Sequence, residues 1–569
     1  MKVLTFLLVV VTGISSLAWA DDYYWIDPAG GELGDGTKWD QGVTPGVDDN
    51  VFFTEPASYT VWLDDSYTHD RMTVEGSDLT LDLNGFTYTL DSTNDYNQAV
   101  IIGDTTTGSV TVRNGGIISH DLFLARKGDD SVGRLDLSGA GTSWVGFDGN
   151  HYSFFYGTAG DAEVSVTDNA YLFHGYGQSG ILIQGSALFN IDGQDSEWSV
   201  SGTFEMSAYG KTTTNVSNGG RVGMGLLKMA TYRGSEATIH VTGTGHESEL
   251  AIENNWTDPV GLFIGVAGKG IINLTGSKLY HSGNTVIAER AGSEGRLNIY
   301  DGSWADCLGS VAVGGSLEQA GGRGLIYLYD DPQNDIYADL SCALQESRFL
   351  VVWPDGTVHM DGGELSTIYD HDSNLANPIN LQGGTLEGGG WIRAYVNNYG
   401  GIVMPGAQGS GYNDWKLLDI SFDYSQDAEA TLKIPIAGTS SGGWSYWNYG
   451  GLNVGGQVTL DGFLDVDLWD NYSPAYAEEY VIIEAQSVSG QFINAASEYV
   501  FEGGKFEVVY QPDRVILTHF QGEPRCTEYP LADFNKDCQV NLIDLAIMAQ
   551  EWLDCNLEPS GYCPGMLPM

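Results

Sequence analysis

Apolar and polar residues alternate with a period of two along most of the chain. Short runs such as Tyr59–Leu63, Leu79–Leu83 and Phe86–Leu90 show this alternation, and Gly, Asp, Asn or Ser bounds each of them. The alternation predicts β-strands with one buried face, and the bounding residues predict tight turns between the strands. Before Gln521 no stretch shows the helical period. The pattern therefore predicts an all-β body.

A degenerate repeat with a period of about 54 residues, in the range typical of stacked repeat architectures, organises this body. Val110–Gly116 is an example of its first half, and Leu135–Trp144 is an example of its second half. The first half returns at 164–169, 214–220 and 272–276, and the second at 188–198, 239–250 and 297–304. The residues that align the second halves are Trp144, Trp198, Leu250 and Trp304.

One such unit cannot bury both faces of its own strands, so the units must stack and share a continuous core. A unit of this length with several strands predicts two or three coils of a solenoid per repeat. A propeller, whose blades have a similar length, is the alternative architecture. It is disfavoured because the pattern does not continue unchanged to the end of the chain, as a closed ring requires.

The pattern V-x-V-x-x-G-G followed by L-x-V-x-G-x-G-S-x-W resembles the repeat of autotransporter passenger domains and of PEP-CTERM-associated, surface-sorted bacterial proteins. The segments Gly400–Gly406 and Val458–Val466 resemble the end of such passengers. The resemblance implies a right-handed parallel β-helix. It divides the body into a capping region at 21–100, repeats at 101–360 and a passenger-like region at 361–520.

The charge of the chain is strongly negative. Lys and Arg number 24 against 75 Asp and Glu, which gives a net charge of −51, and the acids are scattered along the whole sequence. Nucleic acid is excluded as a partner because phosphate binding depends on clustered cations. The 77 glycines and the high share of Thr, Val, Tyr and Trp are typical of a turn-rich β protein.

Residues 1–20 have the layout of a secretory signal peptide. Met1-Lys2 precedes the apolar run Val3–Val11, and the small-residue sequence Ala18–Ala20 follows. No later segment is long and apolar enough to span a bilayer. We therefore expect an extracellular or cell-surface protein that has no transmembrane segment after cleavage.

The most specific motif lies near the C-terminus and reads D-x-N-x-D-x-x-V-N-x-x-D. Calcium takes six to eight oxygen ligands, and oxygens at loop positions 1, 3, 5, 9 and 12 can converge on one ion, with a backbone carbonyl from position 7. The predicted ligands are Asp533, Asn535, Asp537, the carbonyl of Gln539, Asn541 and Asp544. An apolar stripe at helical spacing follows at Leu545, Met548, Ala549 and Trp552. The motif predicts a calcium-binding loop followed directly by a helix.

This loop and helix resemble one type I dockerin repeat, and the sequence Trp552–Cys555 resembles the tail of planctomycete-like secreted proteins. The resemblance implies a calcium-dependent module, at 526–563, that attaches the chain to a cohesin-like or other cell-surface protein. The sequence departs from the pattern in two ways. Cys538 occupies loop position 6, where Gly usually makes the sharp turn, and only one repeat is present.

The six cysteines form an even set, which in an exported chain predicts disulfides. Cys307 and Cys342 lie in the body, and four more lie in the tail, at Cys526, Cys538, Cys555 and Cys563. The four tail cysteines allow three pairings, and their spacing does not choose among them. Zinc is the alternative for the tail, but the spacing fits no C-x-x-C pattern.

No residue is assigned a catalytic role. Glycosidic cleavage needs two facing carboxylates, whereas adjacent residues of a strand point to opposite faces. The pairs in question are Asp64–Asp65, Asp129–Asp130 and Asp330–Asp331. Asp370–Asp372 is best read as a solvated turn, and the aromatic run Trp444–Tyr449 as internal packing with sugar contact as the alternative.

The predicted function is therefore non-catalytic: adhesion, scaffolding or glycan binding by the solenoid, with protein attachment through the tail. The alternative is a carbohydrate-active enzyme, a polysaccharide lyase or a glycoside hydrolase. A surface groove that gathers carboxylates with a basic residue among them would favour the enzyme, and a featureless surface would favour the scaffold.

Overall fold

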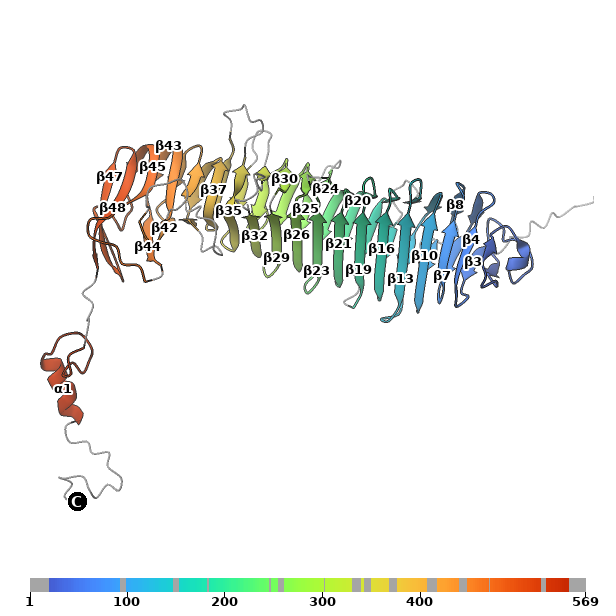
Figure 1. The fold of residues 1–569 in the computed structure, drawn as a ribbon, viewed down its shortest axis with the longest axis horizontal. Coiled ribbons are helices and arrows are strands. Elements are labelled where there is room, and N and C mark those ends of the chain that lie inside the picture. The colour runs from blue at the N-terminus through green and yellow to red at the C-terminus, as the bar shows by residue number, and fades with distance from the viewer. Residues whose placement is uncertain are drawn as a thin grey trace, which may run out of the picture.

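The chain forms a parallel β-solenoid of about 14 coils that is about 59% strand, with one short helix near its C-terminus (Figure 1). This computed structural model describes residues 20–92, 99–146, 153–181, 184–244, 247–253, 260–300, 302–329, 339–341, 349–367, 376–406, 417–439, 448–469, 471–522 and 529–551. The predicted fold class is confirmed, and the propeller is excluded. The signal-peptide prediction falls almost entirely outside the described residues.

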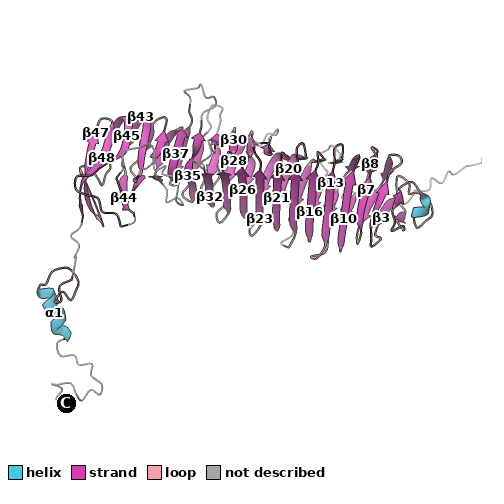
Figure 2. Cartoon of the chain, in the orientation of Figure 1, coloured by secondary structure: helices cyan, strands magenta, loops and turns pink. Residues whose placement is uncertain are grey.

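Three sheets run along the solenoid, because most coils contribute one strand to each. Strands, drawn in magenta in Figure 2, make up nearly the whole body. In the first sheet every neighbouring pair is parallel. Its strands are β2 (Gly31–Glu32), β4 (Ser58–Trp62), β7 (Asp78–Asp82), β10 (Thr107–Arg113), β13 (Val132–Ser138), β16 (Asp161–Thr167), β19 (Ser186–Asp192), β21 (Lys211–Ser217), β23 (Glu236–Thr242), β26 (Lys269–Thr275), β29 (Glu294–Tyr300), β32 (Arg323–Tyr329), β35 (Gly356–Ser366), β37 (Thr385–Arg393), β39 (Ile402–Pro405), β42 (Thr431–Ile436) and β44 (Phe463–Leu468).

The second sheet follows the first around each coil, and the long strands β35 and β37 continue into it. Its other strands are β5 (Tyr67–His69), β8 (Thr87–Leu90), β11 (Gly116–Ser119), β14 (Ser143–Gly146), β17 (Tyr171–His174), β20 (Glu197–Met206), β22 (Arg221–Met229), β24 (Glu249–Ile252), β27 (Lys278–His281), β30 (Trp304–Cys307), β33 (Asp339–Ser341), β40 (Leu417–Ile420), β43 (Gly451–Leu460) and β45 (Glu479–Gly490).

The third sheet closes each coil, and β20, β22, β43 and β45 extend into it. Its other strands are β1 (Asp22–Tyr24), β3 (Asn50–Phe53), β6 (Arg71–Val74), β9 (Val100–Ile102), β12 (Leu122–Leu124), β15 (Ser153–Tyr156), β18 (Tyr176–Ser179), β25 (Val260–Ile264), β28 (Asn284–Ile287), β31 (Val311–Val313), β34 (Leu350–Val352), β36 (Pro378–Gln382), β38 (Tyr395–Tyr399) and β41 (Tyr424–Gln426).

Both ends of the solenoid are capped. At the N-terminal end the short 3-10 helix η1 (Gly36–Lys38) precedes Trp39, whose buried ring packs edge-on against Trp25 with centroids 5.2 Å apart. At the other end three antiparallel strands follow β45: β46 (Glu498–Phe501), β47 (Gly504–Gln511) and β48 (Arg514–Gly522). β46 pairs with β47, β47 with β48, and β48 with β45. These caps cover the terminal coils, where stacking stops.

The repeat found in the sequence corresponds to two coils. Val110 pairs with Leu135 in the next coil, and Leu135 pairs with Val164 in the one after. The two sequence motifs therefore occupy the same sheet in successive coils. Of the two or three coils expected per unit, the structure contains two.

The alignment of Trp304 with Trp144 and Trp198 is wrong by one residue. Four residues separate β19 from β20, but only three separate β29 from β30. Consequently Trp304 pairs with Lys278, and Ala305 takes the inward position beside Leu279. Because successive strand residues face opposite sides of a sheet, Trp304 points outward and is 41% exposed, whereas Trp198 is fully buried.

The core is a continuous column of inward-facing side chains in register. Around Trp198 the ring of Phe189 stacks at 4.2 Å and the ring of Phe204 meets it edge-on at 4.9 Å between centroids. The indole Nε1 of Trp198 donates to Nε2 of the buried His174 at 3.0 Å. The polar end of the indole is thus satisfied inside an apolar column.

The turns after the first sheet explain the asparagines and glycines of the repeat. Asn114 and Asn218 adopt φ of 61° and 53°, the left-handed region that Asn and Gly tolerate best. The backbone N–H of Asn114 donates to Oγ1 of Thr142 in the following coil at 2.9 Å. The turn residues therefore both reverse the chain and tie one coil to the next.

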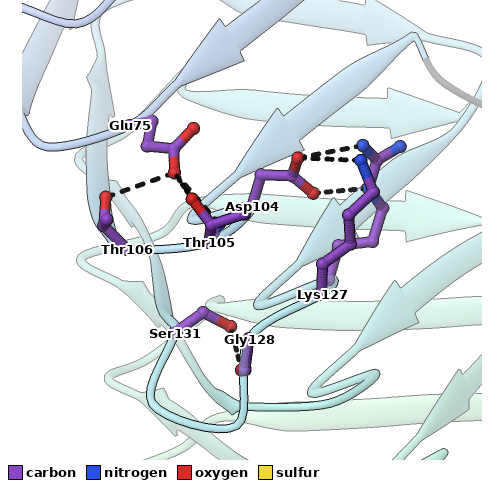
Figure 3. Close-up of polar contacts among 8 residues, drawn as sticks. Glu75, Asp104, Thr105, Thr106, Lys127, Gly128 and Ser131 are labelled. Atoms are coloured by element: carbon purple, nitrogen blue, oxygen red, sulfur yellow. Dashed lines mark hydrogen bonds and ion pairs between the residues drawn. The ribbon is translucent and has the colours of Figure 1, made fainter.

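Ion pairs and hydrogen bonds link successive coils at the turn between the third and first sheets (Figure 3). Asp104 accepts hydrogen bonds from Arg126 Nε at 2.6 Å and Nη2 at 3.1 Å, and from Lys127 Nζ at 3.1 Å. Glu75 accepts from the backbone N–H of Thr105 at 3.0 Å and from the Thr106 hydroxyl at 3.3 Å. Each carboxylate bonds to a different coil from its own, which holds successive coils in register.

The helix α1 (Leu542–Glu551) lies beyond the solenoid (Figure 1). Among the described residues no helix is both long enough and apolar enough to cross a membrane.

Candidate metal centre

Three carboxylates converge just before and within the first turn of α1. Single oxygens of Asp533, Asp537 and Asp544 all lie within 4.8 Å of one another. Asp533 and Asp544 are 7% and 2% exposed, and Asp537 is open to solvent. Two carboxylates of this acidic cluster are therefore shielded from solvent, and the third is accessible to it.

Backbone N–H groups of the loop hold the two buried carboxylates. Asp533 accepts from the backbone N–H groups of Asp537 at 3.0 Å and Cys538 at 2.8 Å. Asp544 accepts from those of Asn541 and Phe534, both at 2.8 Å. The bond from Asn541 contributes most to lowering the pKa of Asp544 below its ordinary value, because it favours the ionised form.

Asn541 and Asp544 also start the helix. Asn541 Oδ1 accepts from the backbone N–H of Ile543 at 2.8 Å, while Asp544 Oδ2 accepts from the backbone N–H of Asn541. The bond from Asn541 to Asp544 is one half of a capping box, whereas the Asn541 side chain caps Ile543, and together the two bonds satisfy two N–H groups at the helix start. The cap fixes Asp544 in place at the loop end.

The remaining predicted ligands surround Asp537. Asn535 donates from Nδ2 to Asp537 Oδ2 at 2.7 Å, and Asn541 donates from Nδ2 to the same oxygen at 3.4 Å. The backbone N–H of Gln539 donates to Asp537 Oδ1 at 2.9 Å. The structure therefore gathers the three predicted carboxylate ligands, and the two asparagines meet that cluster through their amide nitrogens. Turning a side-chain amide over exchanges its oxygen and nitrogen, so either asparagine can present an oxygen to an ion.

The geometry fits a calcium ion. Calcium binds oxygens at roughly 2.3 to 2.6 Å, so ligands on opposite sides of one ion lie about 4.6 to 5.2 Å apart. The 4.8 Å limit on the carboxylate oxygens is compatible with one shared ion. The loop carries three carboxylates and a single Lys536, which leaves an excess of negative charge for a divalent cation to balance.

The departure at loop position 6 has a structural counterpart. Cys538 adopts φ of 70°, the left-handed conformation that Gly supplies in the usual loop, and it is disulfide-bonded. The disulfide predicted for Cys538 is confirmed. Cys342, Cys526, Cys555 and Cys563 lie outside the described residues.

Cys307 differs from expectation, because it is a free thiol. It occupies an inward position of β30, where its Sγ lies 3.7 Å from Oγ1 of Thr285. Burial raises the pKa of this thiol to about 12. Cys307 thus acts as a small core residue, and the even cysteine count misled the disulfide prediction for it.

The apolar stripe predicted for α1 does not become buried in the described part of the tail. Leu545 and Ala549 are exposed, and Met548 is half-buried. Leu542 and Ile543 add to the exposed apolar surface at 80% and 57%. Trp552, the last member of the stripe, lies outside the described residues.

Among the adjacent acid pairs in described segments, Asp64, Asp65 and Asp129 have structural partners. Asp64 accepts from the Tyr67 hydroxyl at 2.7 Å, and Asp65 from the backbone N–H of Ser66 at 2.8 Å. Asp64 faces Glu32 rather than Asp65: a hydrogen bond between Asp64 and Glu32 raises the pKa of Glu32. Asp129 accepts from Gln184 Nε2 at 3.0 Å. Asp330–Asp331, Asp370–Asp372 and most of Trp444–Tyr449 lie outside the described residues.

Sequence reasoning missed a groove on the outer face of the second sheet. Four of its charged members lie on four different strands, Glu197, Arg221, Glu249 and Lys278, and Glu253 directly follows β24. They are scattered along the sequence and form no motif. The signal that could have found them is the repeat itself, once its coil length is known, because equivalent positions of successive coils lie side by side.

No family model matches the chain, and no curated protein sequence matches it.

Proposed function

We propose that this chain is an exported, elongated scaffold that a calcium-loaded C-terminal module attaches to a partner protein. The observation that carries the proposal is the convergence of Asp533, Asp537 and Asp544 beside a capped helix. A calcium ion there neutralises the carboxylate repulsion and joins the loop to the helix start. The likeness to a dockerin repeat supports calcium as the ion and a cohesin-like or other cell-surface protein as the partner.

The exposed face of α1 supports the attachment role. Leu542, Ile543 and Leu545 lie on the first turn of the helix and are all more than half exposed. Exposed apolar patches beside polar residues are typical of protein interaction sites. Because Asp544 belongs to the same turn, the metal and the apolar face are structurally coupled. Loss of the ion would therefore disturb the surface that the partner contacts.

The elongated body supports the scaffold role. The backbone N–H and C=O groups of its strands pair in continuous parallel ladders, and both ends are capped. Asp64, Asp65 and Asp129, from the adjacent acid pairs of the described segments, serve turns and loop contacts. We place adhesion and spacing of the attached module on the solenoid, without catalysis.

Calcium titration of the full chain by isothermal calorimetry tests the metal part of the proposal. We expect the chain to bind one calcium ion when magnesium is present in excess. Asp544→Asn should weaken calcium binding at least a hundredfold, which corresponds to about 2.7 kcal/mol. The control is Glu502→Gln, which removes an acid of the C-terminal cap. Equal calcium affinity in the two variants would contradict the proposal.

A polysaccharide-acting enzyme is the second candidate, because the groove on the second sheet gathers carboxylates with two basic residues. Beside the groove, burial raises the pKa of Asp306, as a general acid requires. Arg221 and Lys278 lie 3.1 and 3.5 Å from Glu249, so this carboxylate is already engaged in ion pairs within the groove. We expect no reducing ends to be released from neutral polysaccharides. Release that Asp306→Asn abolishes would establish the enzyme instead.

A further inference from the structure

Two adjoining hollows form one groove on the outer face of the second sheet. The larger, about 420 Å³, is lined by Glu249, Glu253, Lys278, Tyr280 and Ser282. The smaller, about 210 Å³, lies over β20 and β22 and shares Glu253 with the first. Because its walls come from β20, β22, β24 and β27 in turn, the groove crosses the strands and runs along the solenoid axis.

Strand register gives the groove a repeating wall. One row of outward residues crosses five neighbouring strands, each residue paired with the next: Glu197, Arg221, Glu249, Lys278 and Trp304. A second outward row beside them begins with small residues, Ser199, Gly223 and Ala251, and ends with Tyr280 and Asp306. Neighbouring strands lie about 4.8 Å apart, so similar positions recur at that interval along the axis. A linear polymer that lies along the groove would meet a side chain at each step.

The charges in the groove disfavour an anionic ligand. Arg221 lies 3.3 Å from Glu197, 3.1 Å from Glu249 and 3.3 Å from Glu253. Lys278 lies 3.5 Å from Glu249. Both cations are thus already paired with carboxylates of the groove, and the surplus charge is negative, as it is for the whole chain. Nucleic acids, uronates and sulfated polymers would be repelled.

Two aromatic rings stand at one end of the groove in fixed orientations. Lys278 Nζ lies 5.6 Å from the ring centroid of Tyr280 and 5.8 Å from that of Trp304. Such cation–π contacts restrain both rings. Trp304 is 41% exposed and Tyr280 half-buried. Aromatic faces next to carboxylate and guanidinium groups suit a ligand that has apolar C–H faces and a rim of hydroxyls.

We propose that this groove binds a neutral linear polysaccharide, with Tyr280 and Trp304 stacking on sugar rings and Glu197, Arg221 and Glu253 bonding to hydroxyls. The binding is a property of the solenoid and does not require the calcium loop. It adds a carbohydrate ligand to the scaffold role.

Native gel electrophoresis of the full chain through soluble polysaccharides tests the proposal. Xyloglucan, galactomannan and mixed-linkage β-glucan serve as neutral probes, and polygalacturonate and alginate as anionic ones. We expect at least one neutral polymer to retard the protein and neither anionic polymer to do so. Trp304→Ala should weaken the retardation at least tenfold. The matched control is Tyr399→Ala, which removes an aromatic ring of similar exposure, 42%, from the third sheet.

Three results would overturn the proposal: no retardation by any neutral probe, retardation by the anionic probes alone, or full retardation of Trp304→Ala. Because Trp304 is exposed, its removal should leave the fold intact, and unchanged circular dichroism checks this. Asp544→Asn should bind the polysaccharide as the parent does. Failure of the groove and failure of the metal centre are therefore separate results.

Discussion

The solenoid and the C-terminal loop with α1 are ordered by different forces. In the solenoid, inward side chains such as Trp198 and Phe189 stack in a continuous apolar column, and fully buried residues recur in nearly every coil. In the described part of the tail, Leu531, Leu542 and Ile543 are more than half exposed, and the buried side chains that shape the loop are the carboxylates of Asp533 and Asp544.

Because of this difference, the two regions should respond differently to the removal of metal ions. Apolar burial does not depend on metal ions, so the solenoid should keep its fold in chelator. A loop organised by acidic oxygens gains free energy when a cation binds, and that gain is folding free energy for the loop. A short segment that buries little apolar surface needs such a contribution, together with a disulfide such as that of Cys538.

The largest effect should come from the solenoid core. Trp198→Ala removes a fully buried indole that stacks on Phe189 and donates to His174. We expect the free energy of unfolding to fall by about 3 to 5 kcal/mol. Guanidinium denaturation followed by circular dichroism measures this, with the exposed Tyr399→Ala as control. A loss below about 1 kcal/mol, the size of an average substitution, would show that coils do not depend on their aromatic stack.

The next effect should be confined to the tail. In the parent chain, chelator should speed hydrogen exchange of α1 amides at least tenfold and leave the strands of the solenoid unchanged. The physical reason is that Asp544 both caps α1 and faces the other two carboxylates. Asp544→Asn should show fast exchange with or without calcium. Slow exchange of α1 in chelator would mean that the cap and the disulfide suffice without metal.

The solenoid should instead respond to pH through its buried histidines. Burial lowers the pKa of His174 to about 3 and that of His69 to about 4, so both stay neutral in the folded chain. In the unfolded chain they take up protons below about pH 6.5. Stability should therefore fall as pH drops from about 6.5, by about 1.4 kcal/mol per unit for each such histidine.

His174→Gln tests this linkage. It should remove about 2 kcal/mol of the difference in unfolding free energy between pH 7 and pH 5. His240→Gln, at an exposed position of the first sheet, should leave that difference unchanged. Denaturation curves at the two pH values decide the matter, and an unaltered pH dependence in His174→Gln would refute the assignment.

Much of the fold was predictable because it depends on a local rule repeated many times. Alternation such as that of Leu79–Leu83 predicts strands, and stacking follows from one-sided burial. The position of Trp304 was not predictable, because one residue fewer in a single turn moves each side chain of the following strand β30 to the other face from the one that the sequence alignment gives it.

The two candidate sites differ in the same respect. The ligands of the metal centre lie within one short loop, so their spacing alone was enough to predict that Asp533, Asp537 and Asp544 converge. The groove depends on register between strands such as β22, β24 and β27. Register depends on turn lengths, and a degenerate repeat hides them.

The smallest effect should come from the exposed surface between coils. Lys211 Nζ lies 3.0 Å from Glu236 Oε2 in the first sheet, but their side chains are 70% and 51% exposed. Water and salt screen such a pair, so Lys211→Ala should change the unfolding free energy by less than about 0.5 kcal/mol. Arg126→Ala is the informative comparison, because Arg126 bonds Asp104 with two nitrogens and both side chains are largely shielded. Its loss leaves a shielded carboxylate with the more exposed Lys127 and should cost about 1 to 3 kcal/mol. Denaturation in low and high salt separates the two cases. Equal losses in both variants would mean that exposed pairs contribute to coil register as much as shielded ones do.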